Sequence, residues 1–187
     1  MTFKEYIKNN GIKKDVKDID CSGSSLTDLN GIEMFTDLEY LYCHINSITQ
    51  LPNLDKLVNL RHLYCNNNAL IQLPSLDKLV NLEYLNCRNN DLTELTNLDS
   101  LINLEYLNCH NNDLTQLPSL DKLVNLEYLD CVDNSLTELP SLDKLVNLKY
   151  LNCNNNKLPK SFNGLSTEEV KSLAKQLNRN KKIDELI

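Results

Sequence analysis

The chain of 187 residues contains no tryptophan and only four glycines and five prolines. With so few glycines and prolines there is no flexible linker, so we expect no boundary between independently folding domains. Long apolar runs are missing as well, and none approaches the roughly 18 residues that a membrane-spanning helix needs. The sequence therefore predicts a protein with no membrane partner.

Basic residues are also scarce, because 19 Lys and Arg stand against 26 Asp and Glu and leave a net charge of −7. A surface that binds nucleic acid needs clustered cations to neutralise the phosphates. The composition therefore argues against a nucleic-acid partner.

The first fifteen residues, MTFKEYIKNNGIKKD, lack the apolar core of a secretory signal, and the sequence has no N-x-Ser/Thr glycosylation sequon. We therefore expect a cytoplasmic, intracellular protein, and this expectation includes the inside of a host cell. In a reducing compartment, the odd number of cysteines is expected to remain as thiols.

What the chain does have is a repeat, and its cysteines reveal it, since each lies 22 residues after the one before. Counted from Val16, apolar residues recur at positions 1, 4, 6, 11, 14, 17 and 20, with Asn at position 9. Seven copies begin at Val16, Leu38, Leu60, Leu82, Leu104, Leu126 and Leu148. The cysteines at position 6 are Cys21, Cys43, Cys65, Cys87, Cys109, Cys131 and Cys153.

The fourth copy begins LEYLNCRNNDL at residues 82–92. This LxxLxCxxNxL pattern resembles the leucine-rich repeat signature, with Cys in the last Leu position of the strand. The 22-residue length, with Leu at positions 14, 17 and 20, resembles the subclass found in a protein phosphatase 1 regulatory subunit and in bacterial internalins. The resemblance covers residues 16–158, and it implies neither the phosphatase nor the receptor of the internalins.

The resemblance implies an α/β fold, a right-handed solenoid with a parallel β-sheet on its concave side and short 3₁₀ or extended segments on its convex side. Strand alternation leads to the same shape. Leu85 and Cys87 share one face of a strand, while Tyr84, Asn86 and Arg88 share the other. One repeat cannot bury its leucines, but stacked repeats can.

Each end of such a sheet needs a cover. Capping-box patterns at Thr2–Glu5 and Ser166–Glu169 each precede an apolar stripe and predict two helices. We therefore expect an N-terminal helical cap at 1–15, seven repeats at 16–158 and a C-terminal helical cap at 159–187. The alternative is that one of these helices binds a partner.

Position 9 is expected to hold the turn that leaves each strand, because an amide there can bond backbone groups that the sheet leaves unpaired. Ser24 occupies this position in the first copy. The others carry Asn46, Asn68, Asn90, Asn112, Asn134 and Asn156.

The cysteine column invites a chemical interpretation, but its geometry argues for packing. Zinc needs four ligands that converge on one point, whereas a straight column does not converge. In-register Cβ atoms about 4.8 Å apart exceed the ~3.8 Å typical of a disulfide. We therefore expect buried, neutral thiols that fill the core.

The candidate site is the concave face, where positions 3, 5 and 7 point away from the core. Tyrosine is a frequent anchor of protein interfaces, and carboxylates flank the tyrosines here. The residues predicted to bind a partner are Tyr40, Tyr42, His44, Arg61, His62, Tyr64, Tyr84, Arg88, Tyr106, His110, Tyr128 and Tyr150.

A competing interpretation is that the tyrosines were copied with the repeat and stack only on one another. Departures from the repeat are more informative, and they cluster in the second and third copies. They are Tyr42, His44, Ile45, Arg61, His62, Tyr64 and Ile71. They mark either a patch tuned for a partner or older copies that have diverged.

The three histidines are expected to lie apart and to lack carboxylate or thiol neighbours, so no metal site and no cofactor are expected. No phosphate loop, HExxH or nucleophile elbow is present, and no catalytic residue is assigned. The sequence predicts a non-enzymatic module, monomeric on its own, that binds a protein or peptide on its concave face. The alternative is a structural protein that assembles with copies of itself.

Overall fold

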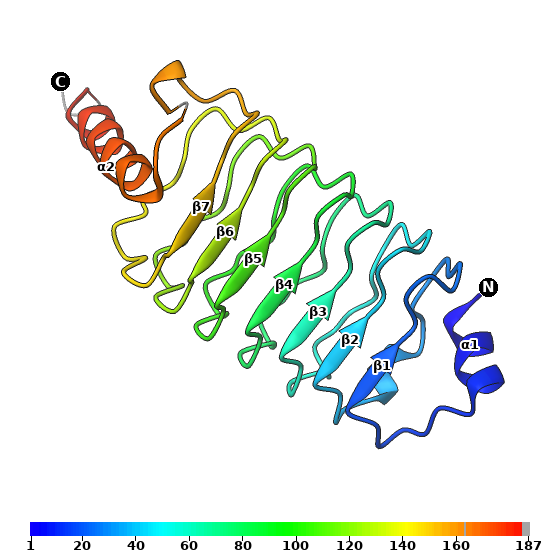
Figure 1. Ribbon diagram of the computed structural model, residues 1–187. Coiled ribbons are helices and arrows are strands. Elements are labelled where there is room, and N and C mark those ends of the chain that lie inside the picture. The colour runs from blue at the N-terminus through cyan, green and yellow to red at the C-terminus, as the bar shows by residue number, and fades with distance from the viewer. Residues whose placement is uncertain (163, 185–187) are drawn as a thin grey trace.

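Seven short strands form one parallel sheet in the computed structural model, which describes residues 1–162 and 164–184 and the side chains as far as Arg179 (Figure 1). The strands follow one another in sequence order. They are β1 Asp18–Asp20, β2 Tyr40–Tyr42, β3 His62–Tyr64, β4 Tyr84–Asn86, β5 Tyr106–Asn108, β6 Tyr128–Asp130 and β7 Tyr150–Asn152. The helices are α1 Phe3–Asn10 and α2 Thr167–Asp184, with 3₁₀ turns η1 Ile32–Met34 and η2 Lys160–Phe162.

The register of the sheet follows directly from the 22-residue period. Leu85 of β4 pairs with Leu107 of β5, and every other strand pair is offset by the same interval. Equal positions of successive copies therefore lie side by side, and the predicted parallel repeat solenoid is confirmed.

One apolar core runs the length of the solenoid beneath the sheet. Leu85 and Cys87 are fully buried from the strand side, and Leu98 and Leu101 from the opposite side. The convex wall consists of extended segments and tight turns, such as the one in which the Leu101 N–H donates to the Leu98 carbonyl at 2.9 Å. The 3₁₀ turn η1 lies in the first copy, so the expectation of 3₁₀ or extended segments on this side is confirmed.

The asparagines at position 9 hold the turn after each strand, as expected. Asn90 donates through Nδ2 to the carbonyls of Cys65, Cys87 and Arg88, at 3.1, 2.9 and 3.3 Å. Its Oδ1 accepts from the Leu70 N–H at 3.0 Å. One amide therefore connects two neighbouring copies and satisfies backbone groups that lie outside the sheet ladder.

A second asparagine ladder, not expected from the sequence, crosses the convex side at position 22. Asn103 Nδ2 donates to the Val80 carbonyl of the preceding copy at 2.9 Å. The equivalent bonds are made by Asn59, Asn81, Asn125 and Asn147. The signal in the sequence was the recurrence of Asn immediately before the first Leu of each copy.

The two helices lie at opposite ends of the solenoid (Figure 1). Helix α1 has the expected capping box between Thr2 and Glu5, ends at Gly11 in the left-handed conformation (φ 62°), and buries Phe3 against Phe35. This packing is the one expected of a cap.

Helix α2 packs on β7 through Val170 and Ala174, whereas Leu177 at the end of its apolar stripe is exposed. Residues 163 and 185–187, which belong to the predicted C-terminal cap, lie outside the described residues. No helix in the described part of the chain is long and apolar enough to cross a membrane.

Candidate functional site

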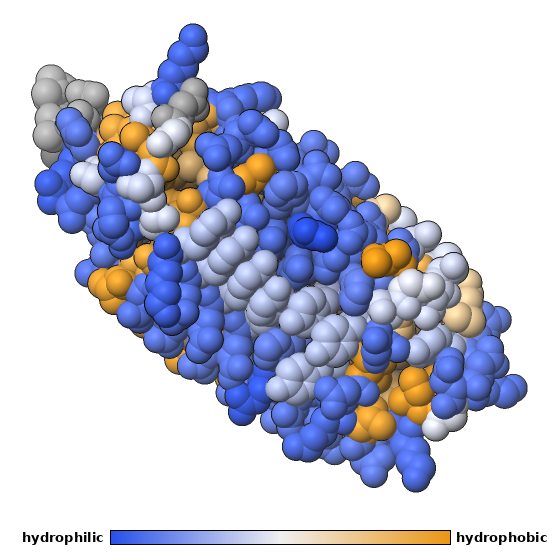
Figure 2. Space-filling model, in the orientation of Figure 1, coloured by the Kyte–Doolittle hydropathy of each residue, from blue (hydrophilic) through white to orange (hydrophobic). Residues whose placement is uncertain are grey.

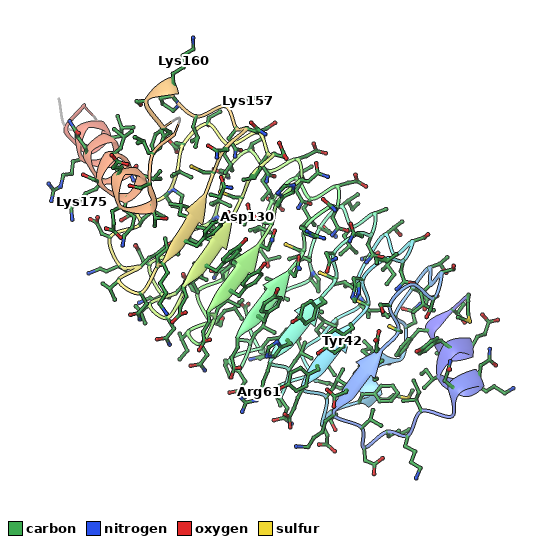
Figure 3. All side chains as sticks on the ribbon, viewed as in Figure 1. Tyr42, Arg61, Asp130, Lys157, Lys160 and Lys175 are labelled. Carbon is green, nitrogen blue, oxygen red and sulfur yellow. The ribbon has the colours of Figure 1, made fainter. Side chains whose placement is uncertain are left out.

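The concave face is formed by the side chains at positions 3, 5 and 7, which point away from the core on all seven strands. Figure 2 shows this side of the molecule, where a pale band of intermediate hydropathy runs along the sheet between hydrophilic flanks. Figure 3 places Tyr42 over β2 and Asp130 over β6, with Arg61 at the edge where β3 begins. Eleven of the twelve predicted site residues occupy the three columns, and Arg61 lies beside them at position 2.

Four tyrosines at position 3 form a continuous stack. The ring centroids of Tyr84 and Tyr106 are 3.9 Å apart with an interplanar angle of 5°. Tyr128 and Tyr150 continue the stack at 4.3 and 4.4 Å. Because these rings lie against one another, their faces are used within the protein and mainly ring edges and hydroxyl groups face outward.

At Tyr84 the single stack becomes two. Tyr64, from position 5, lies 4.6 Å from Tyr84 and continues to Tyr42 at 4.8 Å. His62, from position 3, lies 5.6 Å from Tyr84 and continues to Tyr40 at 4.7 Å. The aromatic surface thus has two columns of rings over β2 and β3 and one column over β5 to β7, because position 5 carries tyrosine only in those two copies.

Position 5 is not open along the whole face, although its side chains point away from the apolar core. Asn86, Asn108 and Asp130 are more than 90 % buried. Asn108 shows the reason, because its Nδ2 donates to the Tyr106 hydroxyl at 3.2 Å and its Oδ1 accepts from the backbone N–H of His110 at 3.0 Å. The tyrosine hydroxyl groups cover these three residues. The residues thus position the tyrosine rings and offer little surface for contact with a partner.

The expectation that the histidines lack carboxylate neighbours is wrong. His62 Nε2 lies 3.8 Å from Glu83, and His110 lies 3.3 Å from Asp133 and 4.0 Å from Asp130. These partners come from the following copy, with Glu83 just before its strand, Asp130 within it and Asp133 in the loop after it, so linear spacing does not reveal them. Burial lowers the pKa of His62, and the Glu83 carboxylate opposes the shift.

The carboxylates beside the face are largely neutralised by position 2 of the adjacent copy. Lys17 bonds Glu39 at 2.6 Å, Lys149 bonds Glu127 at 2.7 Å, and Arg61 pairs with Glu83. The predicted site residue Arg61 is therefore engaged in an ion pair. Arg88, at position 7 just after β4, is exposed. Within the described residues no group of three His, Cys, Asp or Glu side chains is arranged to hold a metal ion.

All seven cysteines are free and buried. Each thiol of the first six copies donates to a carbonyl of the next strand, as Cys87 does to Asn108 at 3.5 Å. Burial raises the pKa of Cys87 to about 12, and that of Cys21 to about 12 as well. A buried, protonated thiol is neither a nucleophile nor a metal ligand, which supports the packing role.

Native cysteines should therefore resist thiol reagents. With a pKa near 12, only ~10⁻⁴ of the Cys87 thiol is ionised at pH 8. Ellman's reagent at pH 8 is expected to label Cys153 first, since it is 7 % exposed and no further copy covers it. The others should react only in denaturant. Rapid labelling of several cysteines in the Cys153→Ser variant would contradict the buried column.

Position 8 forces the backbone into the left-handed region in every copy, with φ between 53° and 60°. Glycine, asparagine and aspartate tolerate this conformation, and they occupy the position in six copies. The second copy instead has Ile45 at φ 55°, and its side chain is 58 % exposed. A β-branched residue there costs about 1–2 kcal/mol, and no core burial offsets that cost.

Comparison with known proteins agrees with this architecture. A family model described as "Leucine Rich repeats (2 copies)" matches residues 58–100, 80–122, 102–141 and 124–167. The chain belongs to the leucine-rich repeat family. No curated protein sequence matches it.

Several solved leucine-rich repeat structures are similar to the chain. YopM, a leucine-rich effector protein from Yersinia pestis, is 34 % identical with a TM-score of 0.61, over 77 % of this chain and 36 % of that one. The functional domain of InlJ from Listeria monocytogenes, described as including a cysteine ladder, is 29 % identical with a TM-score of 0.55. The match covers 82 % of this chain and 42 % of that one. The LRR protein LIC12759 from Leptospira interrogans shares the fold at 24 % identity and a TM-score of 0.65. The match covers 84 % of this chain and 54 % of that one. The chain thus spans about half or less of the length of these proteins.

Proposed function

We propose that the protein is a non-enzymatic module that binds a protein or peptide on its concave face. The observation that carries this proposal is Ile45, an exposed apolar residue held in a strained conformation at a position where the other copies have Gly, Asn or Asp. Strain without a packing benefit is typical of a residue retained for contact with another molecule.

The surroundings of Ile45 support the proposal. Over β2 and β3 the aromatic surface is doubled, and His44 lies against Tyr42 and Tyr64 with ring centroids 6.5 and 6.4 Å away. We call Tyr40, Tyr42, His44, Ile45, His62 and Tyr64 the N-terminal patch. Copying of the repeat explains Tyr40 and the tyrosines of β4 to β7, but it does not explain the other members of the patch, which are Tyr42, His44, Ile45, His62 and Tyr64.

The binding mechanism is preorganisation. The rings of the patch are fixed by stacking, and the strands beneath them by the sheet and the asparagine ladder. A partner therefore contacts aromatic anchors that lose little conformational entropy on binding. We also propose that the protein is monomeric without its partner, which light scattering across a range of concentrations would test.

Capture from a cell lysate tests the function. A tagged protein is compared with its Tyr42→Ala/Tyr64→Ala variant and with Val80→Ala/Val124→Ala, which truncates two exposed convex side chains. Loss of the two tyrosines should reduce capture of a specific partner at least tenfold, because interface tyrosines are typical hot spots. The convex variant should capture as the wild type does. Equal capture by all three proteins would refute the N-terminal patch.

The same assay with Ile45→Asn separates binding from folding. Asparagine tolerates the left-handed backbone, so this variant should gain about 1 kcal/mol in the free energy of unfolding while capture falls. A more stable variant with undiminished capture would remove Ile45 from the proposed contact surface.

A further inference from the structure

The double stack of the N-terminal patch ends abruptly at β1. The register places Asp18 beside Tyr40 and Asp20 beside Tyr42. Among the described residues, no ring stacks on the β1 side of either tyrosine. The aromatic ladder therefore ends in two ring faces on which no further ring stacks, with His44 in an edge arrangement 6.5 Å from Tyr42. The next side chains in the same columns are carboxylates.

Both carboxylates are exposed and carry charge. The Ser22 hydroxyl and backbone N–H donate to Asp20 Oδ1 at 2.6 and 3.0 Å, and these bonds lower the pKa of Asp20. Asp18 forms no ion pair within the described residues. The nearest lysine along the chain, Lys17, is instead bonded to Glu39 at 2.6 Å. Two negative charges therefore remain beside the ring faces.

The opposite end of the ladder has different chemistry. Tyr150 is followed by helix α2, whose Thr167 hydroxyl accepts the Leu151 N–H of the sheet edge at 3.0 Å. Figure 3 labels Lys157, Lys160 and Lys175 at that end, and Lys175 is paired with Asp143 at 3.1 Å. The two columns themselves end in the carboxylates of Asp18 and Asp20 at β1 but in Tyr150 and Asn152 at β7, so a cationic ligand is favoured at the β1 end of the concave face.

We propose that the β1 end of the concave face binds an arginine side chain of a basic, extended peptide segment. The planar guanidinium stacks on the free faces of Tyr40 and Tyr42 and donates hydrogen bonds to Asp18 and Asp20. Tyrosine faces attract cations, and guanidinium–carboxylate hydrogen bonds are stronger than neutral ones. This inference rests on the proposed function and specifies its partner, whose positive charge complements the protein's net charge of −7.

A fluorescently labelled hexa-arginine peptide is the probe, with hexa-citrulline as its neutral isostere and hexa-lysine as a cation without a planar group. Anisotropy titrations should show the highest affinity for hexa-arginine, a lower affinity for hexa-lysine and the lowest for hexa-citrulline. Asp18→Asn/Asp20→Asn should lower the affinity for hexa-arginine at least tenfold, and Tyr42→Leu should lower it severalfold. Asn is compatible with position 5, since Asn86 and Asn108 occupy it in other copies.

Asp91→Asn/Asp113→Asn is the matched control, because it removes the same charge from exposed residues at position 10, beyond the strands. It should change hexa-arginine affinity less than twofold. The proposal is overturned if both double variants weaken binding equally, or if hexa-citrulline binds as well as hexa-arginine.

The outcomes also separate this inference from the proposed function. If Tyr42→Ala/Tyr64→Ala loses a captured partner while Asp18→Asn/Asp20→Asn retains it, the concave function stands and the arginine site fails. If hexa-arginine binds as predicted but no partner depends on the tyrosines, the arginine site stands and the proposed function fails.

Discussion

Replacing Asn90 with alanine is expected to lower the free energy of unfolding by about 3–4 kcal/mol, although the side chain is small and uncharged. The substitution removes four hydrogen bonds, each with a net value near 1 kcal/mol. The carbonyls of Cys65 and Cys87 keep a second amide donor, from Asn68 and Asn112. The buried N–H of Leu70 loses its acceptor altogether.

Urea unfolding of Asn90→Ala and Asn103→Ala measures this difference. Asn103 has the same chemistry but is exposed on the convex side and donates one hydrogen bond, to Val80. The Asn103→Ala substitution is expected to lower the free energy of unfolding by about 1 kcal/mol or less. Similar losses of stability in the two variants would mean that the position 9 ladder does not hold the copies together.

Leu85→Ala is expected to cost about 2–5 kcal/mol, whereas Cys87→Ala, two residues away in the same buried layer, should cost only about 1–2 kcal/mol. Both side chains are fully buried. The leucine leaves the larger cavity, and the cysteine contributes one weak bond, to the Asn108 carbonyl at 3.5 Å. Chemical denaturation of the two variants provides the comparison. A larger loss of unfolding free energy in Cys87→Ala than in Leu85→Ala would show that the thiol does more than fill space.

The fold was predictable because a single period determines strand register, core composition and the turn asparagines together. Leu85, Cys87 and Asn90 recur at the same positions from the second copy onward, and each contacts a fixed position in a neighbouring copy. Local patterns likewise identified both helix starts, because a capping box lies within four consecutive residues.

The candidate site was only partly predictable. Alternation placed Tyr84 on the concave face, but the burial of Asn108 depends on how a neighbouring ring leans over it. The carboxylates beside His62 and His110 come from the following copy, 20 or more residues along the chain. The strain at Ile45 becomes visible only when its φ angle is known. Such features depend on geometry between copies, which a linear pattern does not contain.

The strictly sequential strand order has a consequence for how such a protein changes length. Because each copy bonds only to its neighbours, a whole 22-residue unit inserted among the nearly identical later copies would meet the same contacts on both sides. The β1 end, with Asp18 and Tyr42, would be unaffected, while Lys157 and Lys160 would move away by about 4.8 Å for each added strand. Gene duplication in the later copies would thus adjust the spacing between the carboxylates of Asp18 and Asp20 and the segment of Lys157 and Lys160, and leave both intact.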